Sequence, residues 1–169
     1  MQLLIIRHAI AEDREVFAGT GQDDALRPLT DRGRRRMRLA ARGLRTVVRR
    51  IDLLASSPLV RARQTADIVA QQYPKVERVE VEALIPETPP EQFLTWVVGQ
   101  AERDVVAAVG HEPSLSAIVT WLLAGRQGSL IDLKKGAACL VDFPGPMAAG
   151  RGVLQWALTP TQLRSLGRG

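Results

Sequence analysis

The chain has 169 residues, 46% of them hydrophobic and 24% charged, which is the balance of a globular protein with a sizeable buried core. No apolar stretch approaches the roughly 20 residues that a membrane helix needs, and the short apolar run at residues 3–6 lacks the cleavage pattern of a signal peptide. The single cysteine cannot form an internal disulfide. We therefore expect a cytoplasmic protein without membrane contacts.

Short apolar runs alternate with longer stretches of helical periodicity. We expect strands at about 2–7, 51–56, 77–82, 104–109, 137–142 and 152–158. We expect helices at about 31–50, 59–73, 90–100 and 113–124. Each of the first four strands precedes a helix, which predicts an α/β fold: a three-layer αβα sandwich around a mainly parallel sheet. The stretch between the last two strands is too short for a crossover helix, so it predicts an antiparallel edge hairpin. We expect one domain over residues 1–163 and a frayed tail at 164–169.

The predicted helix at 31–50 carries much of the net charge of +5. Its apolar residues recur at helical spacing and predict a face packed on the sheet: Met37, Ala40, Leu44, Val47 and Val48. Its arginines form a separate stripe that we expect to face water: Arg34, Arg38, Arg42, Arg45 and Arg49. A competing hypothesis is a nucleic-acid-binding module built on this basic helix. No aromatic residues interleave with the arginines to stack on bases, which disfavours nucleic acid as the partner.

Chemically reactive residues follow three of the first four predicted strands. Arg7 and His8 follow the first, Arg61 and Arg63 come soon after the second, and His111 follows the fourth. The loops beyond the carboxyl ends of parallel strands converge on the ligand in open α/β sheets. Two imidazoles, two arginine-bearing loops and helix N-termini at one edge are suited to bind a phosphoryl group. Two histidines without a paired cysteine or matching carboxylate spacing predict no metal site.

Four segments, in order, resemble the motifs of the histidine phosphatase (phosphoglycerate mutase-like) superfamily. The segment LLIIRHAIAE at 3–12 resembles its opening Arg-His-Gly motif, with Ala9 where glycine is more usual. The other three are RPLTDRG at 27–33, SSPLVRARQTA at 56–66 and VGHEPSL at 109–115. Their order and spacing are similar to those of the short bacterial branch, the SixA-type phosphohistidine phosphatases. The resemblance covers nearly the whole chain and implies a phosphoglycerate mutase-like fold.

The resemblance also implies roles for individual residues. His8 would be the nucleophile that becomes phosphorylated, and Arg7 and Arg61 would bind the phosphate. His111 would be the second histidine of the catalytic core, and Arg27 a further candidate phosphate ligand. Arg63, Ser57 and Thr65 have no such match; we expect Arg63 to be structural or solvated and the other two to serve the helix start and packing.

The chemistry requires an unprotonated nitrogen on His8. Like-charge repulsion from Arg7 and Arg61 should lower its pKa below the ordinary value of about 6.5. The other ring nitrogen then needs an acceptor, such as a backbone carbonyl, to fix the tautomer. Positive groups around the phosphoryl oxygens complete the set, and this chemistry needs no metal or cofactor.

The leaving group determines the substrate class. An alkyl phosphate expels a poor leaving group and requires a general acid, for which Glu82, Glu87 and Glu112 are the candidates. Phosphohistidine expels an imidazole that carries its own proton, so an acid matters less. The chain lacks long insertions that could cover the site, which favours a phosphohistidine-bearing signalling or phosphotransfer protein as the partner. A small phosphorylated molecule, cleaved by a phosphomonoesterase or rearranged by a mutase, remains the alternative.

Overall fold

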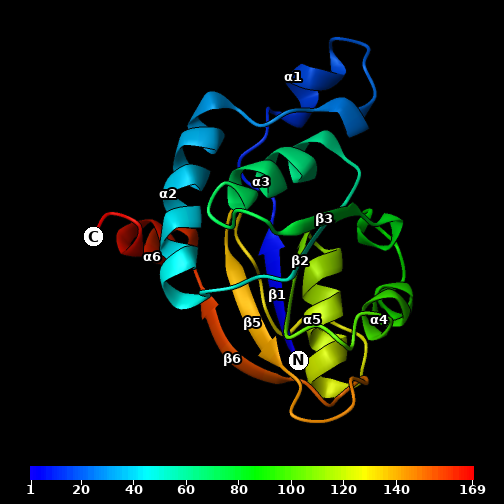
Figure 1. The fold of residues 1–169 in the computed structure, drawn as a ribbon. Coiled ribbons are helices and arrows are strands. Elements are labelled where there is room, and N and C mark those ends of the chain that lie inside the picture. Colours follow the sequence, from blue (N-terminus) through cyan, green and yellow to red (C-terminus); the bar gives the residue numbers. More distant parts are fainter.

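The computed structural model describes all 169 residues and has a six-stranded mixed sheet at its centre (Figure 1). Its strands are β1 (Gln2–Arg7), β2 (Leu53–Ser56), β3 (Glu77–Glu80), β4 (Val105–Gly110), β5 (Ala138–Asp142) and β6 (Val153–Leu158). The strand order is β3-β2-β4-β1-β5-β6. The first four strands are parallel to one another, whereas β5 runs antiparallel to both β1 and β6. The mainly parallel sheet and its antiparallel edge hairpin confirm the predicted fold class.

Six α-helices and two short 3₁₀ helices surround the sheet (Figure 1). The α-helices are α1 (Arg14–Ala18), α2 (Asp31–Val47), α3 (Val60–Ala70), α4 (Pro90–Val98), α5 (Ser114–Ala124) and α6 (Pro160–Leu166). The 3₁₀ helices are η1 (Asp24–Leu26) and η2 (Glu82–Leu84). No helix combines the length and the apolar character needed to cross a bilayer.

Each face of the sheet packs against its own helices. Successive strand side chains point to opposite faces, so Leu4 and Ile6 of β1 join one core with α2, α3 and α6. Leu3 and Ile5 join the other core with α4 and α5. Because both faces are covered, the central strands are apolar on both sides, and residues 3–6 are completely buried.

The structure differs from the sequence expectation at α2. The helix begins at Asp31, where the N-cap Thr30 accepts a hydrogen bond from the backbone N–H of Gly33, and it ends at Val47 rather than near residue 50. Val47 is 40% exposed and does not belong to the buried face. The buried face includes Gly43, which approaches α6 closely.

Near the chain end lies the short helix α6, which the periodicity did not indicate. A capping box formed by Thr159 and Gln162 starts this helix. Residues 164–166, expected to belong to a frayed tail, form its last turn. A Cβ on Gly43 would lie 1.9 Å from the Leu163 carbonyl oxygen, and one on Gly167 would lie 2.0 Å from the Leu39 oxygen. Glycine at both positions therefore allows α6 to lie directly against α2.

Candidate active site

The two histidines of the chain meet at the carboxyl ends of two adjacent strands. His8 follows β1 and His111 follows β4, and the register of these strands pairs Arg7 with Gly110, the residues just before them. The ring centroids of the two histidines are 5.0 Å apart, with an interplanar angle of 53°. Both side chains are buried, at 6% and 2% exposure. The sequence expectation that both imidazoles line one site is thus met in the geometry.

A backbone carbonyl orients the ring of His8. Its Nδ1 lies 2.7 Å from the carbonyl oxygen of Ala9, and a carbonyl only accepts, so Nδ1 carries the proton and Nε2 presents a lone pair. The Ala9 N–H in turn donates to Thr65 Oγ1 at 3.0 Å. The Thr65 hydroxyl donates to the carbonyl of Arg61 at 2.7 Å. Thr65, expected only to pack, therefore connects the backbone that orients His8 to the helix that carries Arg61.

Burial keeps both imidazoles neutral at physiological pH. Desolvation lowers the pKa of His8 to about 3, with further lowering by the charges of Arg61, Arg7 and Lys135, while the hydrogen bond to Ala9 opposes the shift. Repulsion from the arginines, expected from the sequence to cause this shift, therefore contributes less than burial does. Burial also lowers the pKa of His111 to about 2, followed by the influence of His8 and Arg61. A neutral His8 is the nucleophilic form.

Asp24 holds two of the candidate phosphate ligands together. Its Oδ1 accepts from Arg27 Nε at 2.7 Å, and its Oδ2 lies 3.1 Å from Arg61 Nη2. Arg61 also donates to the backbone carbonyl of Asp24 at 2.9 Å, and Arg27 donates to the carbonyl of Glu12 at 2.7 Å. Partial burial of Asp24 opposes ionisation, but the Arg27 hydrogen bond and the nearby arginine charges outweigh it and lower the pKa of this carboxyl.

Three buried polar atoms at this site have no hydrogen-bond partner: Arg7 Nε, Arg61 Nε and His111 Nε2. Buried polar groups are nearly always satisfied in folded proteins, so a cluster of unsatisfied nitrogens is suited to a ligand that accepts hydrogen bonds. Arg7 is oriented by a 2.6 Å hydrogen bond from its Nη1 to the carbonyl of Leu133. An oxyanion is the ligand that two guanidinium groups and an imidazole would share.

These residues line a pocket of about 500 Å³, which we call the histidine pocket. Its lining includes seven basic or imidazole side chains: Arg7, His8, Arg14, Arg27, Arg61, His111 and Lys135. The sequence analysis missed Asp24, Arg14 and Lys135. For Asp24, the only signal in the sequence was its position three residues before Arg27, which is about one helical turn.

The candidate general acids separate into different environments. Glu87 lines the histidine pocket and is exposed. Glu112 also lines it, but its carboxylate accepts hydrogen bonds from the Ser116 hydroxyl, the Ser116 N–H and the Leu133 N–H. Glu82, the first residue of η2, is exposed and does not line the pocket. The structure therefore does not bring Glu82 to the histidines.

The remaining residues singled out near α3 lie outside the pocket. Arg63 is half-exposed and 3.4 Å from Glu80, as expected for a solvated arginine. Ser57 is completely buried, and its hydroxyl accepts from the Leu59 N–H just before α3 begins. Neither side chain lines the space around the histidines.

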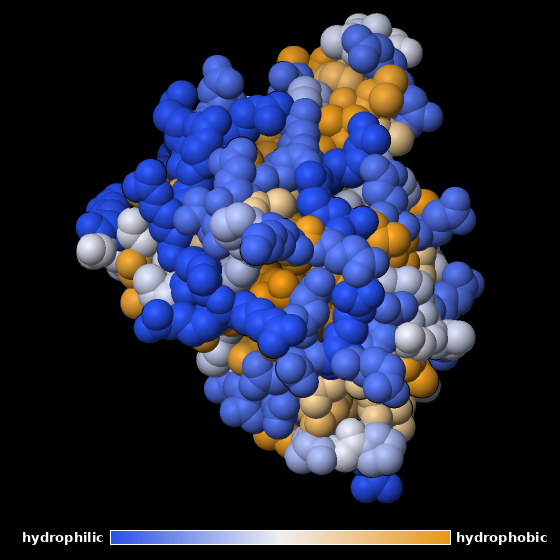
Figure 2. All heavy atoms as spheres, viewed as in Figure 1, coloured by the Kyte–Doolittle hydropathy of each residue, from blue (hydrophilic) through white to orange (hydrophobic).

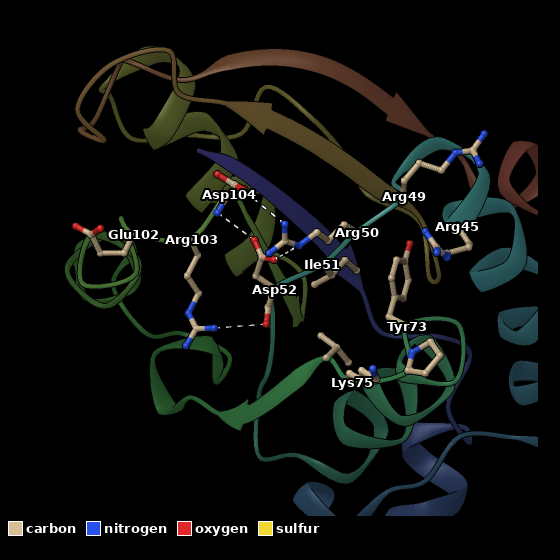
Figure 3. A pocket seen from close by; sticks show the side chains of 12 residues that line it. Arg45, Arg49, Arg50, Ile51, Asp52, Tyr73, Lys75, Glu102, Arg103 and Asp104 are labelled. Carbon is tan, nitrogen blue, oxygen red and sulfur yellow. Dashed lines mark hydrogen bonds and ion pairs between the residues drawn. The ribbon is translucent and has the colours of Figure 1, made fainter.

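A larger cavity, of about 690 Å³, lies at the opposite edge of the sheet, where the segments leading into β2, β3 and β4 meet (Figure 3). It contains five basic residues, and three of them have partners within the chain. Arg50 pairs with Asp52, Arg103 pairs with Glu77, and Arg45 lies 5.3 Å from the ring centre of Tyr73. The cavity also contains three carboxylates and no histidine, so it is a weaker candidate for an anion site than the histidine pocket.

Solved structures of other proteins share the fold of this chain. Among solved structures, the protein histidine phosphatase SixA complexed with tungstate matches with a TM-score of 0.80 and 24% identity, over 96% of this chain and 99% of that one. A phosphoserine phosphatase mutant from Entamoeba histolytica, in complex with phosphoserine, matches with a TM-score of 0.71 and 18% identity, over 96% and 98% of the chains. These likenesses show a shared fold.

Sequence comparison identifies the family. An uncharacterized protein of Picosynechococcus sp. is 34% identical over 137 residues, which are 80% of this chain and 81% of that protein. Residues 3–87, which carry Arg7, His8, Arg27 and Arg61, match the family described as the histidine phosphatase superfamily (branch 1). Together with the shared fold, this match shows that the chain belongs to the histidine phosphatase superfamily (branch 1).

Proposed function

We propose that the protein is a phosphatase that uses His8 as its nucleophile and releases inorganic phosphate through a phosphorylated His8 intermediate. The observation that carries the proposal is the set of three unsatisfied nitrogens beside a neutral, tautomerically fixed imidazole. This arrangement offers hydrogen-bond donors around one oxyanion and a lone pair directed at its phosphorus. Both are what phosphoryl transfer requires of a protein.

The first step transfers the phosphoryl group to the enzyme. The lone pair of His8 Nε2 attacks phosphorus, a new N–P bond forms, and the bond to the leaving group breaks. Arg7, Arg27 and Arg61 neutralise the charge on the phosphoryl oxygens. Binding of a phosphate dianion also favours protonation of His111, because an opposite charge now lies beside its ring. His111 then stabilises the charge that develops in the transition state.

The second step regenerates the free enzyme. Water attacks phosphorus, the N–P bond to His8 breaks, and inorganic phosphate leaves while the imidazole returns to its neutral form. The hydrogen bond from Nδ1 to the carbonyl of Ala9 persists through both steps and keeps the ring in one orientation. Every atom in this cycle comes from the substrate, His8 or water.

We infer that phosphohistidine on a protein is the preferred substrate. Phosphohistidine leaves as an imidazole that carries its own proton, so its cleavage requires little general acid catalysis. This suits a pocket in which Glu112 is already engaged by three donors and Glu82 is absent. The mouth of the pocket also consists of exposed side chains, among them Glu12, Glu87 and Lys135, so that a side chain on a protein surface can enter it.

A small phosphate ester is the second candidate substrate. Glu87 lies in the histidine pocket and has no hydrogen-bond partner for its carboxylate among the protein groups, so it could donate a proton to an alkoxide. Turnover of a phosphohistidine-bearing protein should be compared with that of phosphoserine, sugar phosphates and nucleotides. A higher kcat/KM for one of the esters would assign the protein to small-molecule chemistry.

The nucleophile is tested with an aryl phosphate, whose good leaving group removes the need for an acid. His8→Ala should abolish hydrolysis, and rapid acid-free quenching of the wild-type enzyme should trap phosphate that is stable to alkali and labile to acid. Glu82→Gln, outside the pocket, is the matched control and should retain turnover. Hydrolysis that survives the loss of His8 would refute the proposed mechanism.

A further inference from the structure

A second groove, which we call the α2–α6 groove, adjoins the histidine pocket. It has a volume of about 400 Å³ and shares Arg7 and Lys135 with the histidine pocket. Its remaining lining comes from the turn after β1, from α2, from the segment before β5 and from the start of α6: Ile10, Arg36, Lys134, Pro160, Thr161 and Arg164. The α2–α6 groove therefore lies directly beside the histidine pocket.

The α2–α6 groove is lined by cations and by no acidic side chain. Five of its eight lining residues are arginine or lysine. Lys134 pairs with Asp132, but no carboxylate oxygen lies within 4.0 Å of Arg36, Lys135 or Arg164. The only side-chain hydrogen bond of Arg164 is to Thr161, at 2.9 Å. The groove thus presents charge that the chain itself does not neutralise.

Neighbouring arginines add to this unbalanced charge. Burial lowers the pKa of Arg164, and the positive charges of Arg36, Arg168 and Arg32 lower it further. The two helices cannot separate to relieve the repulsion without losing their close contact at Gly43. Figure 2 shows a predominantly hydrophilic surface over this flank of the molecule. Held in place by the fold, these cations favour an anionic partner.

The cavity at the opposite edge of the sheet provides an internal comparison. It also contains several arginines, but Asp52, Glu102 and Asp104 lie among them (Figure 3). These three carboxylates offset part of the charge of the five cations in the lining, so the attraction for a further anion is weaker there. The α2–α6 groove has no carboxylate in its lining and shares Arg7 and Lys135 with the histidine pocket, so its unbalanced charge lies beside that pocket.

We propose that the α2–α6 groove docks an acidic face of the phosphorylated protein, so that the phosphohistidine of that protein enters the histidine pocket. This inference rests on the proposed function and adds the kind of protein surface that the enzyme selects. Carboxylates around the phosphohistidine would pair with Arg36, Lys135 and Arg164. A protein face suits the α2–α6 groove better than nucleic acid does, because no aromatic side chain lines it for base stacking.

The test uses two synthetic phosphohistidine peptides, one with aspartate and glutamate flanking the phosphohistidine and one with serine and glycine in their place. The readout is the ratio of kcat/KM for the acidic peptide to kcat/KM for the neutral peptide, measured within each protein variant. We expect a ratio of about ten for the wild type, since several exposed charge pairs add modest contributions. The double variant Arg36→Glu, Arg164→Glu should reduce the ratio to about one or below.

The matched control is the double variant Arg38→Glu, Arg42→Glu. It makes the same change in net charge at two exposed positions of α2 that line neither the histidine pocket nor the α2–α6 groove. It should retain the wild-type preference. An equal loss in both double variants would show only long-range steering by net charge, and a wild-type ratio near one would show no docking; either result overturns the inference.

Two further outcomes separate this inference from its alternatives. If neither peptide nor an aryl phosphate is hydrolysed, the proposed function fails, whereas hydrolysis without preference refutes only the docking surface.

Fluorescent single-stranded and duplex oligonucleotides test whether the α2–α6 groove binds nucleic acid instead. Tight, salt-dependent oligonucleotide binding that is lost in Arg36→Glu, Arg164→Glu would assign the α2–α6 groove to nucleic acid and overturn the inference.

Discussion

Asp24 and Arg61 are 37 residues apart in the chain, yet the carboxylate of Asp24 lies 3.1 Å from the Arg61 guanidinium, whose side chain is only 3% exposed. The same carboxylate binds Arg27. One acidic residue of η1 thus aligns two arginines that would otherwise repel each other in a nearly buried space. Their alignment leaves Arg61 Nε free for an anion.

We expect Asp24→Asn to lower kcat/KM for an aryl phosphate by about tenfold, because one amide oxygen cannot align both guanidinium groups and carries no charge to hold them. Asp24→Ala should have a larger effect. The matched control is Asp23→Asn, since the neighbouring Asp23 is exposed, caps η1 and contacts no arginine. Steady-state kinetics of the three variants check the prediction. A wild-type rate in Asp24→Asn would show that the arginines need no such alignment.

Alternation of strands and helices was enough to predict the sheet and the place of the histidines, since parallel strands bring their carboxyl ends to one edge. His8, His111 and Arg61 could therefore be grouped from spacing alone. Asp24 could not, because its role depends on how a loop before α2 folds over the start of α3. Such a contact arises from tertiary packing and leaves no periodic pattern in the sequence.

The short helix α6 was missed for a related reason. Seven residues give too few turns for an amphipathic pattern, and helices of this length are stabilised by packing more than by propensity. The glycines at 43 and 167 that permit this packing were ambiguous in the sequence, because glycine inside a helix usually indicates a weak or ending helix. Lys135 likewise gains meaning only from the position of the segment before β5.

Gly43→Ala should destabilise the protein by about 1–3 kcal/mol, because the added Cβ would lie 1.9 Å from the Leu163 carbonyl oxygen and push α6 away from α2. Gly145→Ala is the matched control, since no atom lies within 4 Å of the corresponding Cβ. Urea unfolding of both variants measures the difference. Equal midpoints for Gly43→Ala and the wild type would show that α6 adjusts without loss.

Stability should fall as the pH drops below about 6.5, the ordinary pKa of histidine. In the folded protein, burial lowers the pKa of His8 to about 3 and that of His111 to about 2, whereas both rings bind protons in the unfolded chain. The unfolded state therefore takes up more protons in this window, and the free energy of unfolding decreases with falling pH. Most carboxylates titrate below about pH 5 and contribute little to this change.

Urea unfolding at about pH 7 and about pH 5.5 checks the sign and the size of this effect. We expect the wild type to lose about 2–3 kcal/mol over this interval, from the two histidines together. His8→Gln removes one of the titrating rings and should lose about half as much. A wild-type stability that is constant or higher at the lower pH would contradict the burial of both neutral imidazoles.

Glu112 is expected to position Arg7 rather than to donate a proton. Its carboxylate accepts the Leu133 N–H, and the carbonyl of Leu133 accepts the Arg7 guanidinium, so the three groups form a chain that ends at the phosphate ligand. Glu112→Gln should weaken this chain and raise KM for every substrate alike, by about three- to tenfold.

Glu87→Gln, in contrast, should lower kcat for phosphoserine while leaving kcat for an aryl phosphate nearly unchanged, because only the poor leaving group needs an acid. A Glu112→Gln enzyme that loses kcat on phosphoserine but keeps its KM for an aryl phosphate would identify Glu112, not Glu87, as the acid.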